Sequence, residues 1–339
     1  MQGYKQLRAA VLVNWVVDKP FGFSINLNKI GGWVVTTIGG PFPRKINLLS
    51  RIFLVWPGYA LVPLKVLFVL RRFDVIIAWQ QVYGIALALL IRLLQLKPSV
   101  KICILSFIIK PAKQKGTFRK VINYALQCSC VHSIICYNET EMAQYKKLFP
   151  NVAHKFSSAI LSEDIEDIQS FQMSDGDYYV AAGRSNRDNN FLIDYFSKHP
   201  ARKLHLITDQ MNSAKLPSNV LLFDNTFGRD YLQQIAGCKA IVMAFKDDTM
   251  SSGQLVFLHA LQFGKPVVAT HSKCLTGYII HELNGLEINK DINELEFALQ
   301  KLDDENCYKL ISSNGLRDYE QRFGFAQLAS RVIEVVLAE

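Results

Sequence analysis

The sequence predicts an α/β fold made of two Rossmann-like parallel-sheet domains that face a cleft, and three observations lead to this prediction. The chain has 339 residues, which exceeds one ordinary core and fits two domains of about 150 to 170 residues each. Short apolar runs alternate with stretches of helical periodicity along the whole chain. Val, Ile and Leu follow one another in these runs without alternating polar residues, so neither face of such a strand would be exposed to solvent. We therefore expect parallel strands covered by helices on both sides.

The first half has this alternation up to Pro150. Its expected strands span residues 9–15, 73–79, 100–107 and 133–136. Its expected helices span 82–96, 117–130 and 139–149, and Asn138 is expected to cap the last of them. Residues 44–72 are expected to be helical in part. A long glycine-bearing segment, ending at Pro43, follows the first strand.

The second half repeats the pattern after a connection around residues 155–177. Its expected strands span 178–182, 203–207, 220–223, 240–245 and 266–270, and its expected helices span 190–198, 229–236 and 254–263. The remainder is expected to be mostly helical to Ala338. We therefore predict an N-terminal domain over residues 1–160 and a C-terminal domain over 161–339.

Charge is divided unevenly between these domains. Residues 1–170 contain 21 Lys and Arg against 8 Asp and Glu, whereas residues 171–339 contain 17 against 21. A basic half suits anionic lipid or a phosphorylated substrate, and a merely solvated basic surface is the alternative. Nucleic acid is disfavoured as a partner because the chain has no zinc-finger spacing and no RNA-recognition signature.

The apolar run from Ile52 to Leu70 is long enough to suggest a membrane span. Pro57, Gly58, Pro63 and Lys65 interrupt it, so we expect two shorter helices or turns that are buried or lie on a membrane surface. The first apolar run, from Ala9 to Val13, is expected to be a strand and not a signal peptide. The seven cysteines are scattered without zinc-site spacing, so we expect free thiols, no metal and a cytoplasmic location.

Polar residues that follow the strands of the second half indicate an anion site, because parallel strands end where helix N-termini present unpaired amides. Gly183 and Arg184 directly follow the strand at 178–182, and Arg187 comes three positions later. Two arginines on such a loop can bind a diphosphate. The alternative is a surface loop in which Arg187 pairs with Asp188.

A second loop enters the helix expected at 254–263. Ser251 or Ser252 is a natural N-cap there, and Gly253 allows the backbone to approach a ligand closely. The cap alone explains one serine but not the whole cluster through Gln254. A third loop, residues 270–273, is expected to line the same crevice.

Several enzyme classes are disfavoured by the motifs that the sequence lacks. No dinucleotide-binding G-x-G-x-x-G follows the first strand, and no G-x-x-x-x-G-K-[ST] occurs in the chain. The G-x-S-x-G nucleophile elbow is also absent. A dehydrogenase, a P-loop enzyme and an α/β-hydrolase are therefore poor interpretations.

The second half resembles the donor-binding domain of GT-B glycosyltransferases, most nearly the family 4 type of bacterial surface-polysaccharide pathways. The resemblance lies in Gly183-Arg184 with Arg187-Asp188, in the stretch from Ser252 to Leu261 that continues from Phe263 to Thr270, and in Asn284-Gly285-Leu286. It implies that Arg184 and Arg187 bind the diphosphate of a nucleotide sugar. It also implies that Ser252, Gly253 and Gln254 contact phosphate or sugar, and that the last helix returns to the first domain.

The sequence departs from this family at two positions. The family usually carries two glutamates eight positions apart, and the matching residues here are Ser251 and His259. A neutral His259 could accept a hydrogen bond from a ribose hydroxyl, and the alternative is a histidine packed between helix and strand. The departure leaves a catalytically inactive nucleotide-sugar-binding or scaffold protein as an open alternative.

The resemblance implies transfer of a sugar from a nucleoside diphosphate to a glycan or lipid-linked acceptor, without metal or other cofactor, and most simply with retention. An inverting enzyme would need a base in the first domain, where Asp18 is the carboxylate best placed after a strand. The basic first half, with Arg44, Lys45, Arg51, Lys65, Arg71 and Arg72 around apolar helices, suits peripheral attachment to the inner membrane leaflet. A nucleotide-sugar epimerase is a third interpretation. It would need acidic and histidine residues across the cleft, and the first half contains few acidic residues.

Overall fold

The computed structural model describes residues 6–40, 56–109, 114–211, 216–250, 252–273 and 275–338. The chain divides into two compact units, one of residues 1–159 together with 325–339 and the other of residues 160–324. Each unit is built on a six-stranded sheet in which all paired strands are parallel. The predicted α/β class with two parallel sheets is confirmed.

The first unit has the strand order β2-β1-β3-β4-β5-β6. Its strands are β1 (Arg8–Leu12), β2 (Val34–Ile38), β3 (Val75–Ala78), β4 (Lys101–Ile104), β5 (Val131–Cys136) and β6 (Phe156–Ser158). The chain moves one way from β1 to β2 and the other way from β3 onward. The order therefore reverses between β1 and β3, which is the type of position where open parallel sheets bind ligands.

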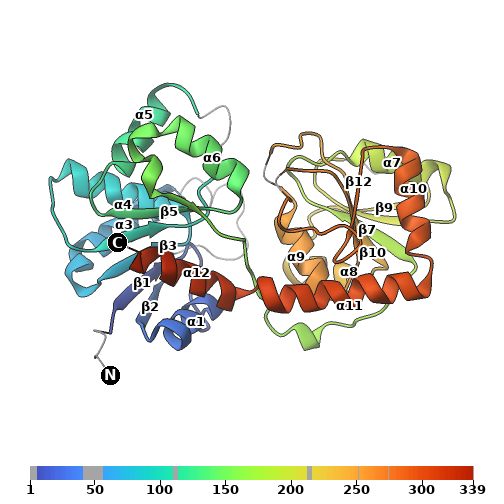
Figure 1. Ribbon diagram of the computed structural model, residues 1–339, viewed down its shortest axis with the longest axis horizontal. Helices are drawn as coiled ribbons and strands as arrows, with labels where there is room; N and C mark the ends of the chain where they lie inside the picture. Colours follow the sequence, from blue (N-terminus) through green and yellow to red (C-terminus); the bar gives the residue numbers. More distant parts are fainter. Residues whose placement is uncertain are drawn as a thin grey trace. The chain divides into compact units, whose positions relative to one another are not determined.

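Helices cover both faces of this sheet (Figure 1). One layer contains α3 (Trp56–Val69) with the 3-10 turn η2 (Leu70–Arg72), α4 (Gln81–Leu93), α5 (Gly116–Leu126) and α6 (Glu139–Leu148), followed by η4 (Pro150–Lys155). The inner residues of these helices share one hydrophobic core with alternate residues of the strands. Helices α1 (Gly22–Gly31) and α12 (Phe325–Leu337) pack against each other on the other side.

Three elements of the first unit differ from the sequence prediction. The glycine-bearing segment contains α1 and β2, where only a loop was expected. Helix α1 ends at Gly32, whose φ of 64° suits glycine, and β2 is an edge strand whose residues are partly exposed. Strand β6 was missed because it has only three residues. All three are short or contain residues that favour loops, so their apolar pattern is weak.

The apolar run at 52–70 also differs from its prediction. From Trp56 onward it forms one helix, with Pro63 in its interior, and not two shorter pieces. Residues 52–55 and the basic residues Arg44, Lys45 and Arg51 lie outside the described residues. None of the helices in the described ranges is long and apolar enough to cross a membrane.

The second unit has the strand order β12-β11-β10-β7-β8-β9. Its strands are β7 (Tyr178–Ala182), β8 (Lys203–Ile207), β9 (Val220–Phe223), β10 (Ala240–Met243), β11 (Val267–Thr270) and β12 (Leu286–Ile288). The short β12 was not predicted from the sequence. Here the order reverses between β7 and β10.

Two helical layers enclose the second sheet (Figure 1). Helices α8 (Gly228–Ala236) and α9 (Gln254–Gln262) pack on one face, and α7 (Asn189–Lys198) and α10 (Ile292–Lys301) pack on the other. Helix α11 (Glu305–Arg322) contributes residues to the cores on both faces, and the 3-10 turn η5 (Ile168–Ser170) precedes β7. The strands at 178–182, 203–207 and 220–223 have the predicted bounds.

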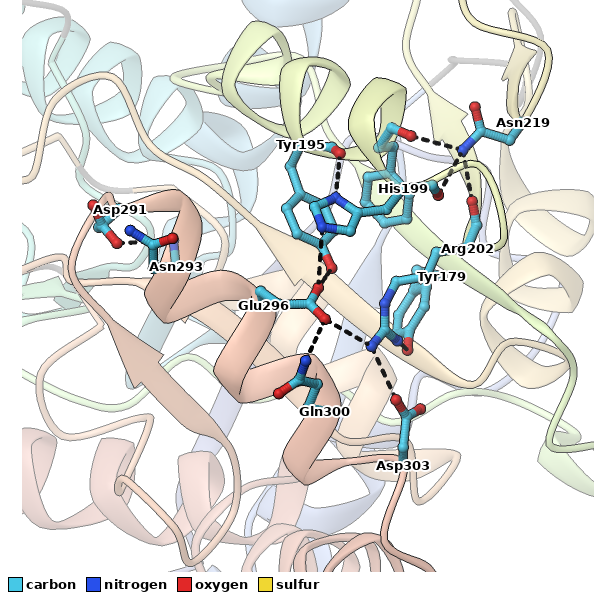
Figure 2. Close-up of polar contacts among 11 residues, drawn as sticks. Tyr179, Tyr195, His199, Arg202, Asn219, Asp291, Asn293, Glu296, Gln300 and Asp303 are labelled. Carbon is cyan, nitrogen blue, oxygen red and sulfur yellow. Dashed lines mark hydrogen bonds and ion pairs between the residues drawn. The ribbon is translucent and has the colours of Figure 1, made fainter.

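A polar network joins the end of α7 to α10, away from the carboxyl ends of the strands (Figure 2). The Tyr195 hydroxyl donates to the Glu296 carboxylate, and Nε2 of His199 lies 3.6 Å from the same carboxylate. Arg202 pairs with Asp303 at 2.9 Å and lies 3.6 Å from Glu296. These groups pair with one another, so the network joins α7 to α10.

Candidate functional site

The loops that follow β7 and β10 meet at the reversal point of the second sheet. The backbone N–H of Asp188 donates to the carbonyl of Ala244 at 2.8 Å. The Asn186 side chain bonds to the Asp247 backbone in both directions, at 2.7 and 2.8 Å. The two loops that the sequence singled out are therefore held together at the position where parallel sheets bind ligands.

Arg187 is the centre of this junction. Its side chain is buried, with 8% of the residue exposed, and Nε donates to the carbonyl of Ala182 at 2.9 Å. One terminal nitrogen, Nη1, donates to the Ser185 carbonyl at 3.1 Å and to the Ser252 hydroxyl. Gly183, with a φ of 123°, leaves room for the guanidinium, because a Cβ there would stand 2.8 Å from Nη2 of Arg187.

The charge of Arg187 has no carboxylate partner at ion-pair distance within the described ranges. Burial lowers the pKa of Arg187 to about 10, and the nearby Tyr231 partly opposes that shift. The guanidinium therefore stays charged at neutral pH. The alternative pairing with Asp188 does not occur, since Asp188 caps α7 and pairs with Lys290 at 3.1 Å. A buried cation bonded only to neutral groups favours an anionic ligand nearby.

Arg184 lies on the surface of the same loop. Its Nε is 3.0 Å from the Asp209 carboxylate, and its guanidinium carbon is 4.5 Å above the Phe227 ring. About half of its side chain, 52%, is exposed. Arg184 is thus held by two surface contacts and can reorient toward a ligand at small cost.

A cavity of about 230 Å³ adjoins Arg184 at the carboxyl ends of β7, β8 and β9. Its wall is mostly apolar, with Ile207, Phe223, Phe227 and Leu255, and its polar groups include Thr208, Asp209, Asn225 and Tyr231. An apolar slot with a few polar groups, among them the side chain of Arg184, has the composition of a small-molecule site.

The start of α9 differs from the sequence prediction. The N-cap is Gly253, at a φ of 98°, and no side chain caps the helix. Ser252 instead uses its hydroxyl on the neighbouring loop, where it donates to the Ser185 carbonyl at 3.1 Å and accepts from Arg187. Gln254 is buried. Ser251 lies outside the described residues.

His259 lies behind the cavity and does not line it. The residue is 6% exposed, and its Nδ1 is 3.1 Å from the Tyr231 hydroxyl. Its Nε2 is 4.0 Å from the Glu163 carboxylate. Tyr231 lines the cavity, so His259 is connected to the cavity wall through the Tyr231 hydroxyl. Sequence reasoning missed Tyr231 and Glu163, because neither belongs to a recognisable motif.

The other expected positions are more dispersed. Asp18 is an exposed residue of the first unit, six positions after the end of β1. In the third loop, the Thr270 hydroxyl accepts from the Phe245 backbone N–H at 3.0 Å, and Lys273 pairs with Asp248 at 3.0 Å. No group of three His, Cys, Asp or Glu side chains in the described parts of the chain is placed to hold a metal ion.

Comparison with known proteins identifies the fold. No family model matches the sequence, and no curated protein matches it. Among solved structures, HepE from Anabaena in complex with UDP-glucose is similar at a TM-score of 0.64 and 15% identity, over 97% of this chain and 99% of HepE.

Two further solved structures are similar to this chain over nearly its full length. Sucrose-phosphate synthase from Thermosynechococcus elongatus matches at a TM-score of 0.67 and 15% identity, over 97% of this chain and 98% of the synthase. WaaG, a glycosyltransferase of lipopolysaccharide biosynthesis, matches at 0.60 and 12% identity, over 98% of this chain and 100% of WaaG. The chain therefore has the GT-B fold of glycosyltransferases, as its sequence motifs led us to expect.

Proposed function

We propose that this chain transfers a glycosyl group from a nucleoside diphosphate sugar to a hydroxyl of a glycan or lipid-linked acceptor. The observation that carries the proposal is the buried Arg187, a charged side chain without a carboxylate partner in the described ranges, at the reversal point of a parallel sheet. A diphosphate beside it would supply the missing negative charge. The adjacent cavity would take the nucleoside.

In this proposal the two arginines have different tasks. Arg187 fixes the loop after β7 to Ser252 and gives the pocket a constant positive potential. Arg184 leaves Asp209 and binds the diphosphate directly through paired charge-assisted bonds. Backbone amides around Gly253, at the start of α9, would contribute further donors to phosphate or to the donor sugar.

The reaction depends on charge that develops as the glycosidic bond breaks. Negative charge grows on the leaving diphosphate, so fixed cations and helix-end amides stabilise the transition state more than the ground state. Arg184 and Arg187 would supply this charge without a metal ion. Retention needs no protein base, whereas inversion would assign the base to Asp18 in the first unit. HepE was crystallised with UDP and UDP-glucose, so a UDP-hexose is the first donor to test.

The acceptor and the cellular setting are further proposals. The excess of Lys and Arg in residues 1–170 suits an enzyme of cell-surface polysaccharide synthesis that works in the cytoplasm, at the inner membrane leaflet. In that arrangement the first unit would bind the acceptor and the second unit would bind the donor.

A second candidate function is a nucleotide-sugar-binding protein without turnover. The specific observation in its favour is His259, which stands where the family carries a carboxylate and is turned toward Tyr231 and Glu163. Binding of a nucleotide sugar without product formation would favour this candidate.

The test is a thermal-shift panel of nucleoside diphosphates and nucleotide sugars on the purified full chain. A bound ligand at 100 times its Kd raises the stability of the native state by about 2.7 kcal/mol, which is a measurable rise in Tm. The proposal expects one base and one sugar to raise Tm most. No shift with any member of the panel would contradict it.

A further inference from the structure

The first unit has a cavity of its own, of about 730 Å³, at the edge of its sheet. The start of β5, the turn η4 and β6 form part of its wall, and the end of α12 completes it. All of these segments belong to the first unit. The cavity therefore differs from the donor cavity of the second unit, and it lies on other strands than β1 and β3, where the order of the first sheet reverses.

Two serines line this cavity from neighbouring strands, Ser133 of β5 and Ser157 of β6. The residues beside them in the sequence, Ile134 and Phe156, pair across the strands and belong to the core on the other face of the sheet. Since successive residues of a strand point to opposite faces, the two serines share the face that α12 covers.

The hydroxyls of these serines are unusual for a strand in a parallel sheet. Ser133 is 3% exposed, and the Oγ atoms of Ser133 and Ser157 are buried without a hydrogen-bond partner in the parts of the chain that the structure describes. Cys103 lies beside Ser133 across the sheet, and a thiol is only a weak partner. An unpaired buried hydroxyl lowers stability, so this wall favours a polar occupant.

Lys155 brings a cation to the cavity at the end of η4. Its Nζ donates to the backbone carbonyls of Leu126 and Cys128, at 3.0 and 2.9 Å. An ammonium group has three N–H donors, so one remains for a ligand. The two carbonyls fix the position of this half-buried cation beside the cavity.

Arg331 brings a second cation, from α12. Its Nε donates to the Ser158 carbonyl at 3.2 Å, and its Nη1 pairs with the Glu334 carboxylate at 3.1 Å. Its Nη2 bonds to no residue in the described ranges. Glu334 is the one acidic side chain among the described residues that line the cavity, which leaves the two cations in excess.

His132 of β5 also lies in this positive environment. Its Nε2 is 3.2 Å from the Val335 carbonyl of α12. Burial is the main cause that lowers the pKa of His132, and the positive charge of Lys101 is the next. The same positive charge would stabilise an anion beside the ring.

We propose that this cavity binds a small phosphate ester. Arg331 and Lys155 would donate charge-assisted hydrogen bonds to the phosphate oxygens, and the hydroxyls of Ser133 and Ser157 would bond to the same ligand. The volume of the cavity lies in the range of sites for small organic molecules, and it exceeds what a single phosphate fills. The site is independent of the proposed function, because the donor cavity belongs to the other unit.

The experiment is calorimetric titration of the full chain with glycerol 3-phosphate at constant ionic strength, with glycerol as the uncharged control. The titration is repeated on Arg184→Ala, so that phosphate bound at the donor site is recognised. We expect glycerol 3-phosphate to bind both proteins and glycerol to bind neither. Hydrogen exchange should slow in residues 150–158 and 331–338 when glycerol 3-phosphate is added.

Two variants of the same ion pair should change the affinity in opposite directions. Arg331→Gln should weaken binding of glycerol 3-phosphate by roughly tenfold, since a charged donor is lost. Glu334→Gln should strengthen it by roughly threefold, since a like charge leaves the wall and Nη1 of Arg331 becomes available. The matched control is Arg119→Gln, at an exposed position of α5 that does not line the cavity, and it should leave the affinity unchanged.

Ser133→Ala tests the buried hydroxyl. It should weaken binding, yet the Tm of the ligand-free protein should stay the same or rise, because an unpaired hydroxyl is removed. A fall in that Tm would mean that the hydroxyl already has a partner in the fold, and the proposal would lose its main support.

Three other results would overturn the proposal. The first is no binding of glycerol 3-phosphate to Arg184→Ala, and the second is an equal loss in Arg331→Gln and Arg119→Gln. The third is weaker binding in both Arg331→Gln and Glu334→Gln, which would mean that the ion pair matters only for the structure. The Tm of each variant identifies a misfolded protein, and Glu334→Gln still decides the question if Arg331→Gln does not fold.

Discussion

The hydroxyl of Tyr231 lies 3.1 Å from Nδ1 of His259, and the Glu163 carboxylate lies 4.0 Å from Nε2 of the same ring. The segment that carries Glu163 is fixed, because its carbonyl accepts from Gln262 at 3.0 Å and from Tyr319 at 2.6 Å. His259 therefore lies between a tyrosine that lines the cavity and a carboxylate from a different segment of the chain.

This arrangement predicts coupling between positions 163 and 259. His259→Glu would place two carboxylates close together at a buried position, so we expect Tm to fall by several degrees, at roughly 2 to 4 °C per kcal/mol. Glu163→Gln in the same chain should restore much of the loss. Thermal unfolding of wild type, both single variants and the double variant gives the interaction term. Purely additive changes would mean that Glu163 does not interact with residue 259.

The exposed Arg184 should be needed for binding and not for stability. Arg184→Ala removes a surface contact with Asp209 and should change Tm by less than about 1 °C, yet weaken binding of a nucleoside diphosphate by about tenfold or more. The matched control is Arg229→Ala, since Arg229 also stacks on a phenylalanine, Phe171 at 4.7 Å, but does not line the cavity. Calorimetric titration of both variants decides the point. Equal affinity in the two variants would remove Arg184 from the site.

Gly253 should resist substitution because of its contacts as well as its backbone. Its φ is 98°, and a Cβ would stand 2.8 Å from the Phe245 ring. Gly253→Ala should therefore lower stability by more than the roughly 1 kcal/mol that a left-handed backbone costs. Gly277→Ala is the control, with a φ of 86° and open space around the new methyl. Chemical denaturation of both variants measures the difference, and similar losses would mean that the close approach to Phe245 has no effect.

The network in Figure 2 predicts acid sensitivity of the second unit. Burial acts to raise the pKa of Glu296, but hydrogen bonds from Tyr195 and Gln300 and the charge of Arg202 outweigh it and lower the pKa below 4.5. A carboxyl whose pKa is lower in the folded state stabilises the fold above its unfolded pKa and loses that effect as pH falls.

Glu296→Gln should therefore lower Tm at pH 7 by about 2 to 4 °C, for a loss of about 1 kcal/mol, and the gap from wild type should close as pH falls below 4.5. Glu305→Gln is the control, because Glu305 forms an exposed pair with Lys309. Scans of Tm against pH measure both. A gap that stays constant with pH would show that the Glu296 charge is not responsible.

The sequence predicted most of the fold because its buried strands are continuous apolar runs. Strand β7 and its following loop were found with the right bounds, and so were the residues that the structure joins there, Arg187 and Ser252. Helix α1 was missed because its sequence, from Gly22 to Gly31, combines glycine and asparagine with few core residues. Its stability comes from packing on α12, about three hundred positions later in the chain.

The details of the site were less predictable. Periodicity places α8 and α9 but does not say that Tyr231 of one bonds to His259 of the other. The prediction that Ser251 or Ser252 is the N-cap of α9 was wrong, because Gly253 has the cap position and the Ser252 hydroxyl bonds to the buried guanidinium of Arg187. Contacts between segments far apart in the chain determine both the Tyr231–His259 bond and the N-cap of α9. The local sequence pattern does not predict such contacts.

Turnover shows most directly whether this chain transfers a glycosyl group. The nucleotide sugar that raises Tm most is incubated with the wild-type chain and a membrane or glycan extract, and release of the nucleoside diphosphate is measured beside Arg184→Ala and Arg229→Ala. We expect the wild type and Arg229→Ala to release the nucleoside diphosphate, and Arg184→Ala to lose most of that release. Release that is equal in all three proteins, or absent from wild type although the donor binds, would contradict it.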